Sequence, residues 1–384
     1  MDLREWQIPT LDRAAGALVA RRLFFHAEKA GFYAWALLER ATWEPLLNEL
    51  GAAPPEAEDA DQYPSRAPFR LWDRYSLDAC GPMLIVALRY ASETLLPPAN
   101  TERSSLPAGT EGSGAGPFAV VARFARGNWY RECIDQLQTV VKSVIEDASQ
   151  KGIVLPPPRR WHRFSNSRLP EKALAIAAGI GAIGRNSLLI ARTSSSAPDL
   201  PVSSSSVVLG VLTLPFSFDI PSEFCQKPVM PFFSLCGTCQ ACVRACPTGA
   251  LVGKAGNDML PTLSGEHKER VPAVQRSAGF RRRLCIQHYA ATAGELPSAI
   301  VQAWSNQLYG CDICLECCPH FNPATHPAAV PGAMGTGSFS AHALATLDDG
   351  EIRALFRNTA LDQRWIEPEA LRRNARLILR KSGT

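Results

Sequence analysis

A run of four cysteines past the middle of the chain constrains its fold and chemistry more than any other feature. From Cys236 to Cys246 the cysteines are separated by two, two and three residues, and Pro247 follows the last of them. This spacing is typical of bacterial ferredoxins, in which three thiolates of one tight loop bind one cubane cluster and the fourth cysteine ligates a second cluster. The sequence therefore predicts a redox protein with two [4Fe–4S] clusters.

A second set of cysteines completes the ligands that two such clusters need. Cys285 is followed by a Cys-x2-Cys pair and by a Cys-Pro pair at Cys318. The predicted partition is Cys236, Cys239, Cys242 and Cys318 for one cluster, and Cys246, Cys285, Cys311 and Cys314 for the other. Cys317 competes with Cys318, because it also continues a ferredoxin-like spacing, but Pro319 favours Cys318.

The distribution of the cysteines favours metal binding over disulfides. Ten of the twelve lie between Cys225 and Cys318, in a large chain without the layout of a secretion signal. Zinc is the alternative metal, but its sites are usually assembled from separated Cys-x2-Cys pairs. The cysteines outside the predicted sites are expected to be structural or spare thiols: Cys80, Cys133, Cys225 and Cys317.

Composition indicates an ordinary well-packed protein of two or three domains. The 384 residues include 46% hydrophobic and 20% charged residues. No apolar run reaches the roughly 20 residues of a membrane span, so we expect a cytoplasmic protein with no membrane partner. The net charge of +4 permits a nucleic-acid partner without requiring one.

Apolar patterning predicts alternating helices and strands before residue 220. Helical spacing covers residues 11–50, 128–149 and 171–178, and buried strands are expected at residues 82–90, 188–190 and 206–214. A Pro- and acid-rich break is expected at 53–65, a loop at 101–116 and helices at 341–380. The predicted segments are an N-terminal helical region (1–65), an α/β domain (66–222), a double [4Fe–4S] domain (223–325) and a helical tail (326–384).

The order of motifs between Tyr75 and Leu379 resembles the epoxyqueuosine reductase family. The resemblance is closest in the cysteine-rich region, including the sequence Cys-Pro-Thr-Gly-Ala-Leu that ends at Leu251. The other matching motifs are Tyr309-Gly-Cys-Asp-x-Cys314, the glycine-rich segment Ala178–Ile190, Arg126-Gly-Asn-Trp-Tyr130, Trp365 and Arg373-Asn-Ala375.

The resemblance implies a nitroreductase-like α/β domain that binds cobalamin, followed by a ferredoxin-like double-cluster domain. The reaction that the resemblance implies is the reduction of an epoxide in a modified tRNA nucleoside. The implied partners are tRNA and an electron donor such as a ferredoxin, flavodoxin or flavoprotein, and we expect a monomer. The residues it assigns to the corrin are Gly179, Gly181, Gly184, Arg185 and Asn186. The glycines have an alternative structural role, as a helix C-cap and a close backbone approach.

Three substitutions separate this chain from the family pattern. Asn166 stands where the family has its proton-donating Asp, and an amide cannot donate a titratable proton. Tyr130 remains as a catalytic candidate, while Trp129 and Arg131 replace the family's Asp and His around it. The proton then comes from Tyr130, Glu171 or water.

The substitutions leave other functions open. One alternative is a reductase that acts on a small molecule instead of tRNA, in the manner of reductive dehalogenases. The other is an iron–sulfur electron-transfer protein without corrin. Three basic runs are candidates for phosphate contacts or for solvated faces: Arg159-Arg160, Arg281–Arg283 and Arg372–Lys381. The seven histidines show no paired spacing that indicates a metal site.

Overall fold

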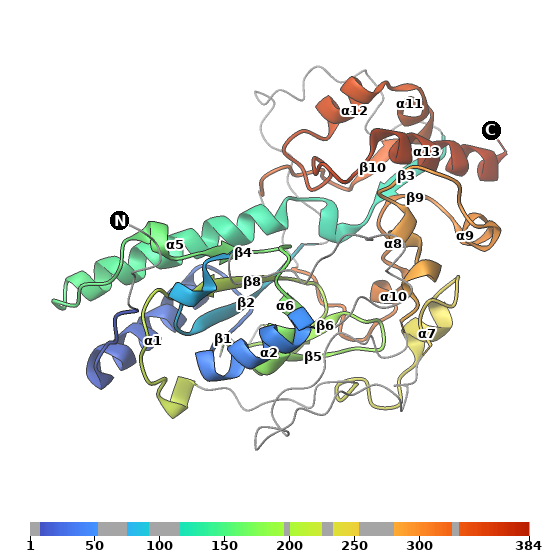
Figure 1. Ribbon diagram of the computed structural model, residues 1–384. Helices are drawn as coiled ribbons and strands as arrows, with labels where there is room; N and C mark the ends of the chain where they lie inside the picture. Colours follow the sequence, from blue (N-terminus) through green and yellow to red (C-terminus); the bar gives the residue numbers. More distant parts are fainter. Residues whose placement is uncertain are drawn as a thin grey trace.

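A four-stranded antiparallel sheet lies at the centre of the computed structural model, in the order β1-β2-β8-β4 (Figure 1). The structure describes residues 8–52, 75–91, 116–195, 200–224, 233–252, 280–324 and 330–383. The strands are β1 (Ala34–Leu38), β2 (Met83–Arg89), β8 (Val207–Thr213) and β4 (Arg163–Phe164). The predicted break at 53–65 and nearly all of the loop predicted at 101–116 lie outside the described residues.

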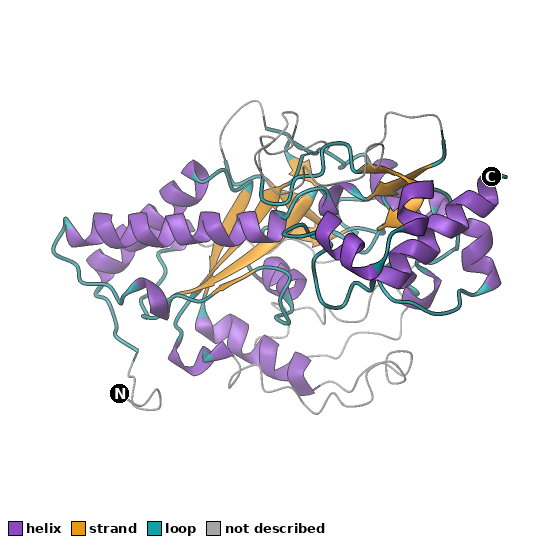
Figure 2. Ribbon diagram, turned by 90° about the horizontal axis from the view of Figure 1, so that it is seen from above, coloured by secondary structure: helices purple, strands orange, loops and turns teal. Residues whose placement is uncertain are grey.

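Helices cover both faces of this sheet (Figures 1 and 2). One face packs against α1 (Arg13–Lys29) and α5 (Trp129–Ser149), and the other against α2 (Arg40–Ala52) and α6 (Glu171–Ala177). Along β2, Leu84 and Val86 face the first layer, whereas Met83 and Ile85 face the second. Burial on both sides explains the continuous apolar runs from which β2 and β8 were predicted, and both predictions are confirmed.

The helix predicted across residues 11–50 is wrong in its middle. Gly31, with φ +82°, follows the end of α1, and Ala34–Leu38 form the strand β1 instead of helix. All five β1 residues are buried, and Ala34 pairs with Ala87 of β2. The apolar spacing matched a helical period, but sheet pairing over a continuous apolar run decides the local structure.

The helix predicted at 128–149 is confirmed as α5. Its N-cap is Asn128, whose side chain accepts a hydrogen bond of 3.1 Å from the backbone N–H of Arg131. Helix and sheet approach closely at Gly210, where a Cβ atom would lie 2.5 Å from the Sγ of Cys133. Cys133 is fully buried at this contact, which agrees with its predicted role as a structural thiol.

Two smaller sheets connect this core to the rest of the chain. One has the order β5-β6-β7, and the other, β10-β3-β9, joins strands from three of the four predicted segments. Their bounds are β3 (Phe118–Val121), β5 (Gly181–Ile183), β6 (Leu189–Arg192), β7 (Ser203–Ser204), β9 (Gln307–Tyr309) and β10 (Ser338–Ser340). Because β3 pairs in parallel with β9, the backbone before Cys311 lies beside the segment that leads into α5.

The cysteine-rich region contains only short helices among its described residues. They are α7 (Ala241–Ala245), α8 (Ile286–Tyr289), α9 (Ser298–Ala303) and α10 (Ile313–Glu316). Short 3₁₀ helices occur at Leu77–Ala79, Arg123–Ala125, Pro158–Arg160, Ser222–Phe224 and Arg282–Leu284. Within the part of the chain that the structure describes, no helix combines the length and the apolar composition that a bilayer crossing needs.

The tail is helical, as predicted, and packs on the small β10-β3-β9 sheet. Its helices are α11 (Ala341–Thr346), α12 (Asp349–Leu355) and α13 (Pro368–Ser382). Asn374 of α13 is fully buried and donates hydrogen bonds to the carbonyls of Ala290 (3.0 Å) and Leu308 (2.8 Å). The tail is therefore fixed directly to the cysteine-rich region.

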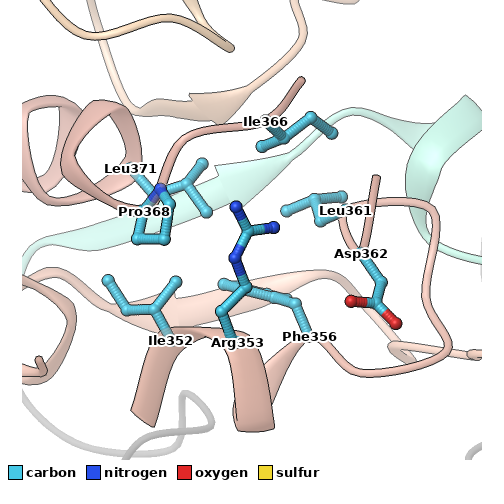
Figure 3. Close-up of a pocket in the computed structure, with 8 residues that line it drawn as sticks. All are labelled: Ile352, Arg353, Phe356, Leu361, Asp362, Ile366, Pro368 and Leu371. Atoms are coloured by element: carbon cyan, nitrogen blue, oxygen red, sulfur yellow. The ribbon is translucent and has the colours of Figure 1, made fainter. Parts of the chain in front are cut away.

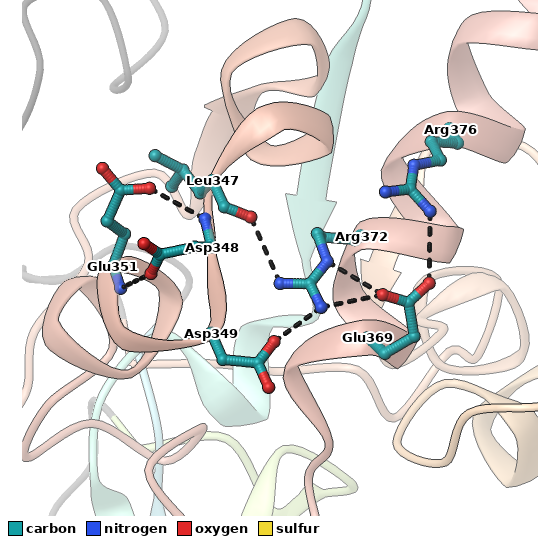
Figure 4. A network of polar contacts seen from close by, with 7 residues as sticks. All are labelled: Leu347, Asp348, Asp349, Glu351, Glu369, Arg372 and Arg376. Carbon is teal, nitrogen blue, oxygen red and sulfur yellow. Dashed lines mark hydrogen bonds and ion pairs between the residues drawn. The ribbon is translucent and has the colours of Figure 1, made fainter.

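Arg372 links the two longer helices of the tail (Figure 4). Its guanidinium forms ion pairs with Asp349 at the start of α12 (2.5 Å) and with Glu369 of α13 (2.8 Å), and it donates to the carbonyl of Leu347. Lys381, near the end of the same helix, donates to the backbone carbonyls of Gln302 in α9 and of Trp304 just after it. These contacts assign much of the C-terminal basic run to intramolecular bonding.

Candidate metal centre and active site

The predicted ligands collect around the short helices of the cysteine-rich region. Helix α7 carries Cys242 and packs against α10, which carries Cys314 (Figure 1). The loop before α7 turns tightly, because the N–H of Cys236 bonds to the carbonyl of Phe233 and that of Cys239 bonds to the carbonyl of Cys236. Residues far apart in the sequence are thereby brought to one place.

The first sulfur group consists of five thiols: Cys236, Cys239, Cys242, Cys317 and Cys318. Burial is the main cause that raises the pKa of Cys242 to about 11, and the neighbouring sulfurs of Cys317, Cys318 and Cys236 act in the same direction. The sulfur of Cys317 also interacts electrostatically with Cys239. The structure thus brings together the four residues predicted for one cluster, with one additional thiol beside them.

The second sulfur group consists of the four thiols predicted for the other cluster: Cys246, Cys285, Cys311 and Cys314. Burial raises the pKa of Cys311 to about 11, and the sulfurs of Cys285 and Cys246 contribute in the same direction. Burial followed by interactions with Cys311 and Cys285 raises the pKa of Cys314. Each thiolate that forms here disfavours the next one, so a positively charged metal cluster would relieve their repulsion.

Cys246 differs from its neighbours because its surroundings favour the thiolate. Burial alone would raise its pKa, but hydrogen bonds from the Thr248 side chain and from the backbone N–H groups of Thr248, Ala250 and Leu251 lower it overall. The Thr248 hydroxyl lies 3.5 Å from the sulfur. All these donors belong to the Cys-Pro-Thr-Gly-Ala-Leu motif, so this motif positions donors around a ligand as well as supplying the ligand itself.

Hydrogen bonds distinguish Cys317 from Cys318. The Cys317 thiol lies 3.6 Å from the carbonyl of Cys314 and donates to it, which requires a bound proton. The sulfur of Cys318 instead accepts from the backbone N–H of His320, while the nearby hydroxyl of Ser205 donates to the carbonyl of His320 at 3.1 Å. An acceptor environment suits a metal-bound thiolate, so these contacts favour Cys318 as the ligand.

The donor set fits two [4Fe–4S] clusters, since each takes four cysteine thiolates. A mononuclear zinc site needs sulfurs about 2.3 Å from one ion. Within the described ranges, no group of three or more His, Cys, Asp or Glu side chains is arranged to hold a single ion. Cys225, His267 and His326 lie outside those ranges.

The glycine-rich segment has the structural roles that the sequence allowed for it. Gly179 follows α6 with φ +78°, and its N–H bonds to the carbonyl of Ile176, while the N–H of Ile180 bonds to that of Ala175. This is a Schellman C-cap, in which glycine removes the steric cost of the left-handed conformation. A Cβ on Gly181 would lie 2.3 Å from the carbonyl oxygen of Ile190, so glycine is required for the close pairing of β5 with β6.

The turn between β5 and β6 brings the predicted corrin-binding residues against the first sulfur group. The backbone N–H of Arg185 donates to the Sγ of Cys236 at 3.5 Å, and its guanidinium donates to Gly237 and lies over Phe233. Asn186 is 4% exposed, and its Nδ2 has no hydrogen-bond partner. A buried amide donor in this turn fits a ligand rich in carbonyl groups, such as a corrin with its amide side chains.

The predicted catalytic residues lie on neighbouring elements around the start of α6. Asn166 has φ +52° in the loop between β4 and α6, and Tyr130 is in the first turn of α5. Burial raises the pKa of Tyr130, and the carboxyl of Glu171 adds to the effect. Asn166, Tyr130 and Glu171 therefore belong to one site. The sequence suggested Glu171 only as an alternative proton source.

The pocket drawn in Figure 3 lies elsewhere, between α12 and α13 of the tail. Arg353 extends into it among mainly apolar side chains. It is lined by Ile352, Arg353, Phe356, Leu361, Asp362, Ile366, Pro368 and Leu371. None of these residues is a predicted site residue, so the pocket carries no functional assignment.

Comparisons with known proteins identify relatives across much of the chain. No family model matches it. It is 29% identical over 206 residues to the epoxyqueuosine reductase of Listeria monocytogenes, a match that covers 51% of this chain and 41% of that protein. It is 28% identical over 324 residues to that of Synechococcus sp., covering 82% of this chain and 79% of the relative. The match to the first relative thus spans less than half of that protein's length.

Solved structures extend the likeness to almost the entire chain. Epoxyqueuosine reductase from Streptococcus thermophilus aligns with a TM-score of 0.60 and 17% identity, covering 95% of this chain and 81% of that one. An epoxyqueuosine reductase solved with an epoxyqueuosine-modified tRNA stem loop aligns with a TM-score of 0.55 and 21% identity, covering 94% of this chain and 80% of that one. The mixed α/β fold is therefore that of these enzymes, and the chain is a divergent relative of the epoxyqueuosine reductases that it matches.

Proposed function

We propose that the chain is a cytoplasmic, cobalamin-dependent iron–sulfur oxidoreductase that reduces epoxyqueuosine in tRNA to queuosine. Its relatives carry the name of that activity, and one of them was solved with the modified tRNA stem loop. The observation that carries the proposal is the 3.5 Å contact between the Arg185 backbone and the Cys236 sulfur. It brings the segment assigned to the cofactor directly beside thiols assigned to a cluster.

The proposed roles of the residues follow from their positions. Cys236, Cys239, Cys242 and Cys318 bind one cluster, and Cys246, Cys285, Cys311 and Cys314 bind the other. Cobalamin supplies, when bound, a strongly reducing metal for breaking the C–O bond. The residues that hold it are Gly179, Gly181, Gly184, Arg185 and Asn186, while Tyr130 and Asn166 orient the substrate. Electrons enter from a ferredoxin, flavodoxin or flavoprotein.

The proposed tRNA surface includes Arg159 and the run Arg281–Arg283. The side chains of Arg159 and Arg281–Arg283 are exposed. Arg372 forms ion pairs within the tail, and Lys381 donates to backbone carbonyls of the cysteine-rich region. Arg281–Arg283 also lie just before Cys285, so phosphates bound there would be close to the second sulfur group. Binding through these arginines should weaken as salt rises, because each phosphate contact releases counterions.

The experiment that tests the function begins with anaerobic reconstitution with iron, sulfide and cobalamin. We expect about eight irons and one cobalt per chain, and conversion of epoxyqueuosine-containing tRNA when a low-potential donor is added. Asn186→Leu, which removes the unpaired amide donor, should lower cobalt retention while leaving iron unchanged. Arg380→Ala, an exposed substitution in the tail, is the matched control.

Three results would redirect the proposal. Eight irons without retained cobalt would leave an electron-transfer protein. Protein that is fully loaded with iron and cobalt and reduces small substrates, but not the tRNA, would be a reductase of another molecule. Fewer than four irons, with zinc retained instead, would remove the iron–sulfur assignment altogether.

A further inference from the structure

The start of α6 contains a partly buried carboxyl group that the roles proposed so far do not use. Glu171 is the first residue of that helix, and its Oε1 accepts hydrogen bonds from the backbone N–H (2.9 Å) and the hydroxyl (3.0 Å) of Ser167. The backbone N–H of Asn166 also donates to this carboxyl. Glu171 is therefore bonded to the loop residue that replaces the family's proton-donating Asp.

The other elements around this carboxyl provide no direct cationic partner among the described residues. From α5, Tyr130 and the buried thiol of Cys133 interact electrostatically with Glu171. From α6, the adjacent Lys172 directs its ammonium to the carbonyl of Ser187, at 2.9 Å. Glu171 and Tyr130 both retain some exposed surface, so a ligand lying over the loop can reach them.

These surroundings favour the protonated acid. Burial raises the pKa of Glu171 to about 7, against the lowering effects of the bonds from Ser167 and Asn166 and of the charge of Lys172. An acid of this strength is protonated in a large fraction of molecules at neutral pH and can still release the proton. The amide of Asn166, in contrast, can only hydrogen-bond to an oxygen.

We propose that Glu171 is the proton donor of this chain, replacing the missing Asp, while Asn166 holds the departing oxygen and Tyr130 lies beside both. The assignment rests on the proposed function. In the net reaction the epoxide gains two electrons from the external donor and two protons, its C–O bonds break, and it leaves an alkene and water. Glu171 gives one of those protons to the departing oxygen and regains a proton from solvent.

A purely structural role for Glu171 makes different predictions, since it needs only the hydrogen bonds to the loop. Glu171→Gln keeps the Oε1 acceptor and the side-chain shape but removes the titratable proton. Asn166→Asp restores an acid at the family's position. Glu171→Gln therefore tests the titratable proton while keeping the hydrogen bonds to the loop. The double variant with Asn166→Asp tests whether an acid at position 166 can replace the one at position 171.

The experiment measures single-turnover rates on epoxyqueuosine-containing tRNA between about pH 5.5 and 9, with fully loaded protein and excess reduced donor. The wild-type rate should fall about tenfold per pH unit above about pH 7. E171Q should be slower by about 10²-fold or more and should lose this dependence. Adding N166D to E171Q should recover at least about tenfold. Infrared titration of cofactor-free protein should show a protonated carboxyl band that disappears near pH 7 and is absent in E171Q.

The outcomes distinguish the two proposals. A wild-type protein that is loaded but inactive on the tRNA overturns the proposed function and, with it, this role. An active wild type whose rate and pH profile survive in E171Q overturns only the role of Glu171. The role of Glu171 also falls if the infrared band near pH 7 is unchanged in E171Q, because the titrating carboxyl is then a different one.

Discussion

The central sheet region and the cysteine-rich region differ in how much regular structure supports them. The sheet is enclosed by two layers of helices, and residues such as Leu84, Leu137 and Trp43 are fully buried. Around the cysteines the described helices have only four to six residues, and most of the sulfurs are partly exposed. Apolar burial therefore stabilises the first region. The second region has its own apolar core around Ile286, Ile300 and Trp304, and we expect the proposed clusters to add to its stability.

The largest expected effect comes from removing a cluster ligand. Cys242→Ser should lower the iron content from about eight to about four per chain and abolish reduction of the tRNA, because one cluster loses a ligand. Hydrogen exchange should accelerate in residues 233–252 and remain slow in β2, since the sheet does not rely on the metal. Equal acceleration in both regions would refute the contrast between them.

Cys317 and Cys318 provide a matched pair for the same measurement. Cys318→Ser should lose iron as Cys242→Ser does, because its sulfur accepts a hydrogen bond as a ligand should. Cys317→Ser should retain about eight irons, because its thiol donates to a carbonyl and so is not needed as a ligand. The opposite result would exchange their assignments and leave the rest of the partition intact.

A substitution in the sheet core should lower the stability of the chain without lowering its iron content. Leu137 is fully buried between α5 and the sheet, and Leu137→Ala is expected to destabilise the chain by about 2–5 kcal/mol. The folded protein should still hold about eight irons, which iron analysis alongside denaturant titration checks. Lys142→Ala, exposed on the same helix, is the control.

The raised pKa of Glu171 also predicts how the free energy of unfolding depends on pH. Its folded-state pKa of about 7 exceeds the ordinary 4.5, so the native state holds a proton that the unfolded state loses between these values. Its contribution is complete below pH 4.5 and is lost as pH rises through 7, by about 3 kcal/mol. Denaturation of E171Q should lack this decline, whereas exposed Glu223→Gln should keep it.

The sequence predicted correctly those elements whose residue pattern lies within the element itself. The apolar runs of β2 and β8, the amphipathic pattern of α5 and the cysteine spacing all depend on residues close in the chain. The strand β1 was missed because its apolar positions fit either period and only pairing with β2 decides between them. Local signals are sufficient where no distant partner determines the structure.

Contacts between residues far apart in the chain also limited how much of the site could be predicted from the sequence. The strands β3, β9 and β10 have three or four residues each, too few for a pattern, yet their pairing positions the backbone before Cys311. The burial of Glu171 likewise depends on how the loop with Asn166 folds over α6. The candidate ligands could be predicted from cysteine spacing, but the surroundings that adjust their chemistry could not.

The smallest expected effect concerns the tail, which resembles the sheet region in its reliance on apolar packing. Arg372 pairs with Asp349 and Glu369, whose side chains are 69% and 48% exposed, so solvent screens both interactions. Arg372→Ala should therefore cost only about 1 kcal/mol in a denaturation experiment and leave iron unchanged. Asn374→Ala removes a buried donor to two carbonyls and should cost more, about 1–3 kcal/mol. If Arg372→Ala proves the more damaging, the ion-pair network within the tail contributes more to stability than the buried contact of Asn374 with the cysteine-rich region.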